Sequence, residues 1–90
     1  MPTIFNVFGY HIYFWSNENN EPIHVHAATG SPRGNATKFW ILASGDVLLA
    51  DNTPNISSKD IRLLKDFIRA NSKQIVAEWI AFHGYEKYYA

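Results

Sequence analysis

The sequence predicts an α+β fold, in which an antiparallel sheet of four to five short strands is followed by one kinked helix or two successive C-terminal helices packed on one face. Residues 1–50 are β-rich, because short runs of branched and aromatic residues alternate with glycine, proline and polar turn residues. Residues 57–83 instead repeat apolar side chains at helical spacing. Ninety residues, 47% of them hydrophobic, are enough for a single compact domain over residues 1–90.

The β-rich half is predicted to contain up to five strands. Gly9, the polar turn that ends at Pro22, the loop 30–34 and Gly45 interrupt the apolar runs and mark where the strands end. Because the connections are short, hairpins between sequence neighbours are favoured over the crossovers of a parallel sheet. The expected strands are residues 3–8, 10–15, 23–28, 36–42 and 47–50.

The helical half is expected to begin at Ser57, which can act as an N-cap with Asp60 three residues later as the partner of a shortened capping box. The helical pattern stops near Gly84. Asn71 interrupts it and could cap a second helix, so one kinked helix and two successive helices both fit. We expect Trp79 to be buried against the sheet. The apolar stripe consists of Ile61, Leu64, Phe67, Ile68, Ile75, Val76, Trp79 and Phe82.

Composition excludes several functional classes. Eight Lys and Arg residues balance eight Asp and Glu residues, so no strong non-specific attraction to nucleic acid or anionic membranes is expected. The absence of cysteine excludes disulfides, thiolate metal sites and cysteine nucleophiles. No apolar run approaches the ~20 residues of a membrane span, and the N-terminus lacks the regions of a signal peptide. We therefore expect no membrane association and a cytoplasmic location.

Side-chain alternation divides the predicted sheet into two unlike faces. The aliphatic face is expected to pack on the helices, and it contains Ile12, Phe14, Ile23, Val25, Phe39 and Ile41. The opposite face contains His11, Tyr13, Trp15, His24, His26, Lys38 and Trp40. A solvated face would carry Thr, Lys, Glu or Ser, whereas this one is aromatic and rich in histidine. Three uses fit it: stacking on nucleobases, holding a metal or substrate, or burial against another protein chain.

The densest group of chemically able side chains lies in SNENNEPIHVH, residues 16–26. His24 and His26 project to the same face of an extended strand, where two packed and hydrogen-bonded histidines are one interpretation. A divalent metal such as zinc is another, but it needs a third ligand beside the two imidazoles. The candidates for that ligand are Glu18, Glu21 and His11. We expect both histidines to serve function rather than the core, so that replacing both with alanine leaves the fold nearly intact.

Two further roles are open to this face. In a hydrolase acting on RNA, one histidine of the pair would act as base and the other as acid. Lys38 or Arg33 would stabilise the charge that develops on the phosphodiester. The catalytic candidates are therefore His24, His26 and Lys38. Direct contact with a protein is the other role, and it is favoured over base stacking because the net charge is zero. The contact residues would be His11, Tyr13, Trp15, Arg33 and Trp40.

Several runs resemble the domain-of-unknown-function 4160 family (DUF4160) of small bacterial proteins: MPTIF at residues 1–5, GY at residues 9–10, NEPIHVH, and KFW at residues 38–40. The resemblance covers nearly the whole chain, and NEPIHVH is its most specific part. Members are often encoded beside a small protein of the domain-of-unknown-function 2442 family (DUF2442). The resemblance therefore implies a protein partner and a toxin–antitoxin-like pair, but it defines no reaction.

The leading functional prediction is a protein-interaction module, one half of a toxin–antitoxin-like two-component pair, that uses the aromatic and histidine face. The partner would be a small DUF2442-like protein or a second copy of the chain. The alternative is a small hydrolase, either an RNase or a metal-dependent enzyme, that uses His24 and His26. A third donor within coordinating reach of both histidines favours the enzyme, whereas a flat apolar surface favours the partner.

Overall fold

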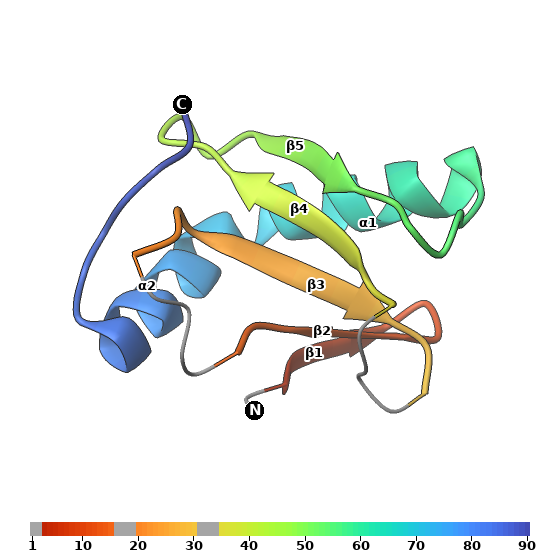
Figure 1. The fold of residues 1–90 in the computed structure, drawn as a ribbon, viewed down its shortest axis with the longest axis horizontal. Helices are drawn as coiled ribbons and strands as arrows, with labels where there is room; N and C mark the ends of the chain where they lie inside the picture. The colour runs from red at the N-terminus through yellow and green to blue at the C-terminus, as the bar shows by residue number, and fades with distance from the viewer. Residues whose placement is uncertain (1–2, 16–19, 31–34) are drawn as a thin grey trace.

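The computed structural model describes residues 3–15, 20–30 and 35–90. Its strands form one antiparallel sheet in which each strand pairs with its neighbours in sequence, in the order β1-β2-β3-β4-β5 (Figure 1). The strands are β1 (Thr3–Val7), β2 (Tyr10–Tyr13), β3 (His24–Ala28), β4 (Thr37–Ile41) and β5 (Val47–Asp51). Two helices follow, α1 (Ser58–Ala70) and α2 (Ser72–His83), which confirms the predicted α+β fold.

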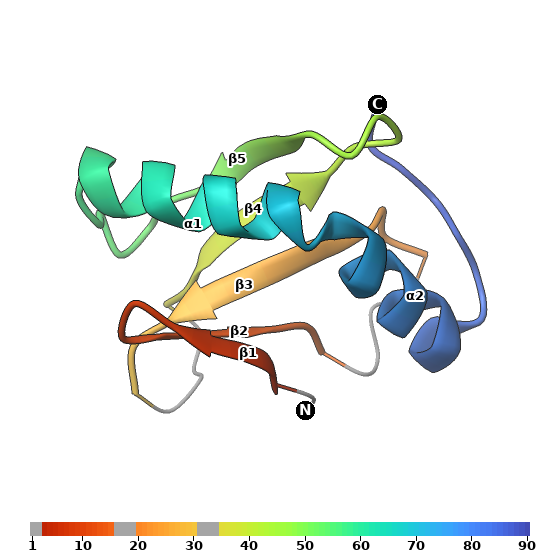
Figure 2. The same cartoon turned by 180° about the vertical axis from the view of Figure 1, so that it is seen from behind.

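Both helices lie on the same side of the sheet, so the fold has two layers (Figure 2). α1 packs beside β5, and α2 continues from it past the end of the sheet where β3 begins. Within the described ranges, neither helix combines the length and the apolar composition that crossing a bilayer requires.

The helical half contains two helices because Asn71 ends the first one. Its Nδ2 donates to the carbonyl oxygen of Phe67 at 2.9 Å, and its backbone N–H lies 3.2 Å from the carbonyl oxygens of both Phe67 and Ile68. These bonds satisfy carbonyls that would otherwise lack partners at a helix end. Asn71 is the N-cap residue of α2, as predicted, but its side chain makes no capping bond to that helix. Gly84 ends α2 in the left-handed conformation (φ 76°), as predicted.

The start of α1 is capped by Ser57, as predicted. Its Oγ accepts a hydrogen bond from the backbone N–H of Asp60 at 3.1 Å. The Asp60 carboxylate accepts a bond from the Tyr10 hydroxyl at 2.6 Å and so connects α1 to β2. Burial, reinforced by this carboxylate, raises the pKa of Tyr10 to about 12.

Ser57→Ala should lower the free energy of unfolding by about 1 kcal/mol, because the Asp60 N–H loses its acceptor. Ser58→Ala is the matched control: Ser58 is equally exposed but is not the capping residue, so its replacement should change stability by less than about 0.5 kcal/mol. Urea denaturation of both variants measures the difference. Equal midpoints would contradict the assignment of Ser57 as the cap.

The core lies between the sheet and the helices and uses the predicted aliphatic face. The sheet side is fully buried, and it comprises Ile12, Phe14, Ile23, Val25, Phe39 and Ile41. From the helices it is covered by Leu64, Ile68, Ile75 and Trp79. The predicted burial of Trp79 is thereby confirmed. Phe82, the last member of the predicted apolar stripe, is 54% exposed, and its ring packs against that of Phe14.

The residues after α2 form a tail that the sequence analysis did not anticipate. The tail runs from the end of α2 back to the β4–β5 connection (Figure 1). The Ile23 N–H donates to the Lys87 carbonyl at 2.8 Å, and the Ala43 N–H donates to the Ala90 carbonyl at 3.1 Å. Backbone bonds at Lys87 and Ala90 therefore hold the tail beside the start of β3 and the end of β4.

Candidate functional site

Six rings form a continuous path on the sheet side opposite the aliphatic core, and we call this set the aromatic face. In spatial order they are Trp15, Tyr13, His26, His24, Trp40 and Tyr89. The antiparallel register creates the path, since Tyr13 lies opposite His26 and His24 lies opposite Trp40. Successive ring centroids are between 4.9 and 5.6 Å apart. The structure thus brings together five of the residues that the sequence assigns to the site, and Tyr89 joins them from the tail.

His24 is fully buried in this face. Its ring lies edge-on to Trp40, at 5.6 Å, and to Trp79, at 5.2 Å. Its Nδ1 is 2.8 Å from the carbonyl oxygen of Pro22. A carbonyl only accepts, so Nδ1 carries the proton and the neutral ring is the Nδ1–H tautomer. Burial, opposed in part by the Pro22 bond, lowers the pKa of His24. His24 is therefore part of the packed interior, and a functional role for it stays a prediction.

Tyr13 and His26 form the centre of the aromatic face. Their rings stack with centroids 5.3 Å apart and an interplanar angle of 28°. Tyr13 is fully buried and packs with Ala28 and Ala36 in a small second core, whereas His26 is half-buried. The part of this face that the sequence analysis expects to be open therefore belongs largely to the folded interior.

Lys38 and Glu21, a predicted catalytic residue and a predicted metal ligand, bind each other. The Lys38 ammonium lies 3.0 Å from the Glu21 carboxylate and 4.2 Å from the centroid of the Trp40 ring. A cation in this position is attracted by the negative face of the indole. Lys38 therefore covers part of Trp40, and an anionic substrate would have to compete with Glu21 for its charge.

Within residues 3–15, 20–30 and 35–90, no group of three or more His, Asp or Glu side chains is arranged to hold a metal ion. His11 is bonded to Asn6 on the neighbouring strand. Glu18 and Arg33 lie outside the described residues. The zinc site and the contact through Arg33 therefore stay predictions.

A family model matches most of the chain. The family model for DUF4160, described as a domain of unknown function, matches residues 9–80. The chain belongs to the DUF4160 family. Comparison with curated proteins and with solved structures found no match.

On this DUF4160 chain, apolar side chains remain exposed at one end of the aromatic face. Tyr89 is 57% exposed and stacks on the half-buried Trp40, with ring centroids 5.0 Å apart and planes 5° from parallel. Leu48 lies opposite Trp40 on β5 and is 42% exposed. We call these three residues the Trp40 patch. Trp15, at the other end of the aromatic face, is 37% exposed.

Three residues at or beside the candidate site of this chain were not predicted from the sequence. Leu48 and Tyr89 belong to the Trp40 patch, and the alternation of β5 with its neighbour gave a usable signal for Leu48 alone. His83 is the third: its Nε2 lies 3.0 Å from the carbonyl oxygen of Trp15, and its Nδ1 lies 3.2 Å from that of Trp79. The signal for His83 was its place in the last helical turn, where carbonyls need donors.

Proposed function

We propose that this DUF4160 protein is a protein-interaction module whose contact surface is the Trp40 patch. The observation that carries the proposal is the exposure of Tyr89 and Leu48 on either side of Trp40. Aromatic residues are enriched in protein interfaces, and apolar side chains grouped on one surface mark interaction sites. Lys38 at the edge of the patch would supply the polar contact that such interfaces carry at their rim.

The finer part of the proposal is a toxin–antitoxin-like two-component pair acting in the cytoplasm. Membership of the DUF4160 family supports it through the partner that the family resemblance implies, a small DUF2442 protein. A second copy of the chain is the other candidate for the partner, because an apolar patch of this kind also suits self-association.

The hydrolase alternative has less support. A general acid or base must reach the proton that it transfers, and His24 is fully buried beneath Trp40 and Trp79. Lys38, which would steady the developing charge, is paired with Glu21. An interaction module therefore accounts for the exposed residues, whereas a hydrolase would require a conformational change that exposes His24.

Leu48→Asp should weaken binding to the purified DUF2442 protein by about 10–100-fold, since a carboxylate would be buried in the centre of the interface. Leu63→Asp is the matched control, because Leu63 is similarly exposed (36%) but lies on α1, away from the patch. Calorimetric titration gives both affinities, and thermal denaturation verifies that both variants fold. Sedimentation of the protein alone measures self-association.

Two results would contradict the proposal. One is equal affinity, or equal self-association, of Leu48→Asp and the unmodified protein. The other is a loss that follows Leu63→Asp instead, which would place the interface on the helices. Cleavage of single-stranded RNA that disappears with His26→Ala would favour the hydrolase.

A further inference from the structure

One edge of the sheet is open along a short strand. β5 is the last strand in the sheet order and pairs only with β4. An edge strand presents unpaired backbone N–H and C=O groups, which proteins normally shield with Lys, Pro, bulges or covering segments. The sequence of β5, VLLAD, contains neither Lys nor Pro. Its bulge inserts Ala50 near the C-terminal end, so the regular part of the edge runs from Val47 to Leu49. The Val47 N–H at the start of this part donates to the Asp46 carboxylate at 2.8 Å, which leaves the Val47 carbonyl and the Leu49 backbone for a partner.

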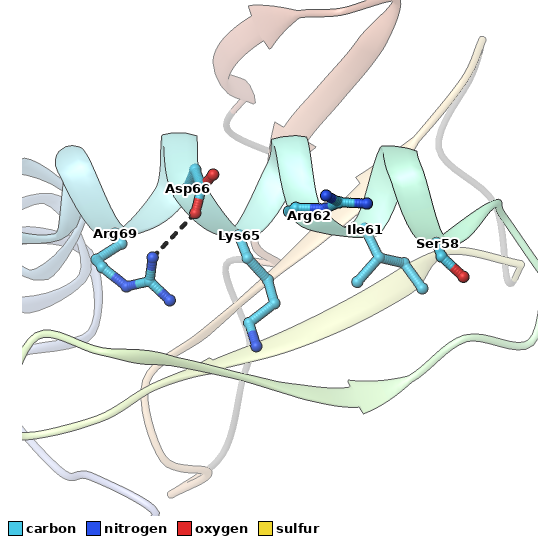
Figure 3. Close-up of a pocket in the computed structure, with 6 residues that line it drawn as sticks. All are labelled: Ser58, Ile61, Arg62, Lys65, Asp66 and Arg69. Atoms are coloured by element: carbon cyan, nitrogen blue, oxygen red, sulfur yellow. Dashed lines mark hydrogen bonds and ion pairs between the residues drawn. The ribbon is translucent and has the colours of Figure 1, made fainter.

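The helix beside this edge carries cations on the same side. A hollow of about 330 Å³ lies along α1. The side chains of Ile61 and Lys65, which line it, point toward β5 (Figure 3). Arg69 is held at one end of the hollow by Asp46, at 2.8 Å, and by Asp66, at 3.0 Å. The hollow is lined by Ser58, Ile61, Arg62, Lys65, Asp66 and Arg69.

Two of these cations form no ion pair within the described part of the chain, although Lys65 is attracted electrostatically by Asp46. Arg62 and Lys65 form no ion pair with any described residue, unlike Arg69. The three cations of the hollow outnumber the two carboxylates that bind Arg69, namely Asp46 and Asp66, so the net charge there is positive. Ile61, which packs partly against the core, provides the apolar part of the hollow's surface. The other edge of the sheet differs, since α1 meets β1 there through Phe67, whose ring packs on Phe5 at 5.0 Å.

We propose that the β5 edge and the basic hollow of α1 together bind an acidic, extended segment of a partner protein. The segment adds a strand to β5, and its backbone bonds to the open edge. Its carboxylates on the helix side meet Lys65 and Arg62, while an apolar side chain between them lies on Ile61. The site shares Leu48 with the Trp40 patch, but it uses the backbone edge of β5 and the cations of α1, so it stands whether or not that patch binds a partner.

Charge decides the occupant. If β5 paired antiparallel with β5 of a second copy, the two-fold axis would stand perpendicular to the sheet and both α1 helices would lie on the same side. Lys65 and Arg62 of each copy would then face their counterparts, and like charges in such positions are unfavourable. Nucleic acid fits less well, because two free cations on a chain of zero net charge offer few phosphate contacts and leave the strand edge unused.

The experiment titrates the isotope-labelled full chain with a short capped peptide of alternating glutamate and valine, followed by amide NMR. Saturable shifts should appear in residues 47–51 and around Lys65. The peptide with lysine in place of glutamate should bind at least about tenfold more weakly, since each attraction becomes a repulsion. An N-methylated glutamate peptide, which keeps its charge but cannot add a strand, should lose binding to a similar degree.

Two charge-reversal variants of α1 test which cation binds the peptide. Lys65→Glu should weaken binding of the glutamate peptide by about tenfold, whereas Lys59→Glu, the same change near the start of α1 in a second hollow with Leu63, should have a small effect. No saturable shift with the glutamate peptide overturns the proposal. Equal binding of the N-methylated peptide overturns strand addition. Shifts at α1 produced by a single-stranded oligouridylate and not by the peptide identify a phosphate site instead.

Discussion

Trp79→Ala should lower the free energy of unfolding by about 3–5 kcal/mol, which is a large share of the total for a domain of this size. Trp79 is fully buried, and its ring packs against Phe14 at 5.3 Å, His24 at 5.2 Å and His83 at 4.0 Å. It thereby touches both the main core and the aromatic face, so its removal leaves a cavity that neither side can fill alone. Urea denaturation monitored by circular dichroism measures the loss.

Two variants make this result specific. Phe82→Ala, three residues further along α2, should cost less than about 1 kcal/mol because Phe82 is half exposed. Trp79→Phe should cost less than Trp79→Ala, because the indole Nε1 makes no hydrogen bond among the described residues and the loss is mainly one of packing. A Trp79→Ala midpoint close to that of Phe82→Ala would contradict the position of Trp79 in the core.

His24→Ala should be the second most damaging change, at about 2–4 kcal/mol. It removes a ring buried between Trp40 and Trp79, and it leaves the Pro22 carbonyl without its donor. The sequence analysis expects the opposite, namely that the histidine pair can be replaced without harm to the fold. His11→Ala is the control on the same sheet face, and with a partly exposed side chain it should cost less than about 1 kcal/mol. Equal stability of the two variants would restore the functional interpretation of His24.

The same residue makes stability depend on pH. Burial holds the pKa of folded His24 below its unfolded value of about 6.5, so the unfolded chain takes up a proton first as the pH falls. The contribution of neutral His24 is therefore complete above about pH 6.5 and is lost below it, by at most about 1.4 kcal/mol per pH unit. His24→Phe should remove this slope. Stability curves of the two proteins that stay parallel from pH 7 to about pH 5 would contradict the prediction.

Most of the fold was predictable because local chemistry and the demands of the core agree. Gly9 and Gly45 adopt positive φ angles of 80° and 89°, so each ends a strand at a turn that other residues enter at a cost. The alternation of aliphatic residues selected the buried face correctly. The sequence does not distinguish one kinked helix from two helices at Asn71, because an asparagine can bond either to the helix that it ends or to the helix that follows.

The candidate site was only partly predictable. Alternation determines which side chains share a face, but it does not determine what covers that face. Here Trp79 and the tail approach His24 and Trp40 from segments more than 35 residues away in sequence. The tail, residues 85–90, has neither helical nor strand periodicity, so nothing in its sequence indicated that Tyr89 would stack on Trp40. Alternation therefore places the histidines on the correct face, but it does not reveal that His24 is buried there.

The order of the strands has a consequence for how quickly this chain folds. Every strand pairs only with its sequence neighbours, so each hairpin closes a short loop and the sheet has low contact order, which is typical of rapid folding. The bonds of greatest sequence separation join the other parts of the molecule: His83 to Trp15, 68 residues apart, and Lys87 to Asn20, 67 residues apart. Closing these long loops carries the larger entropic cost, so the sheet should form early in folding. The packing of Trp79 and the tail against the aromatic face should be completed last.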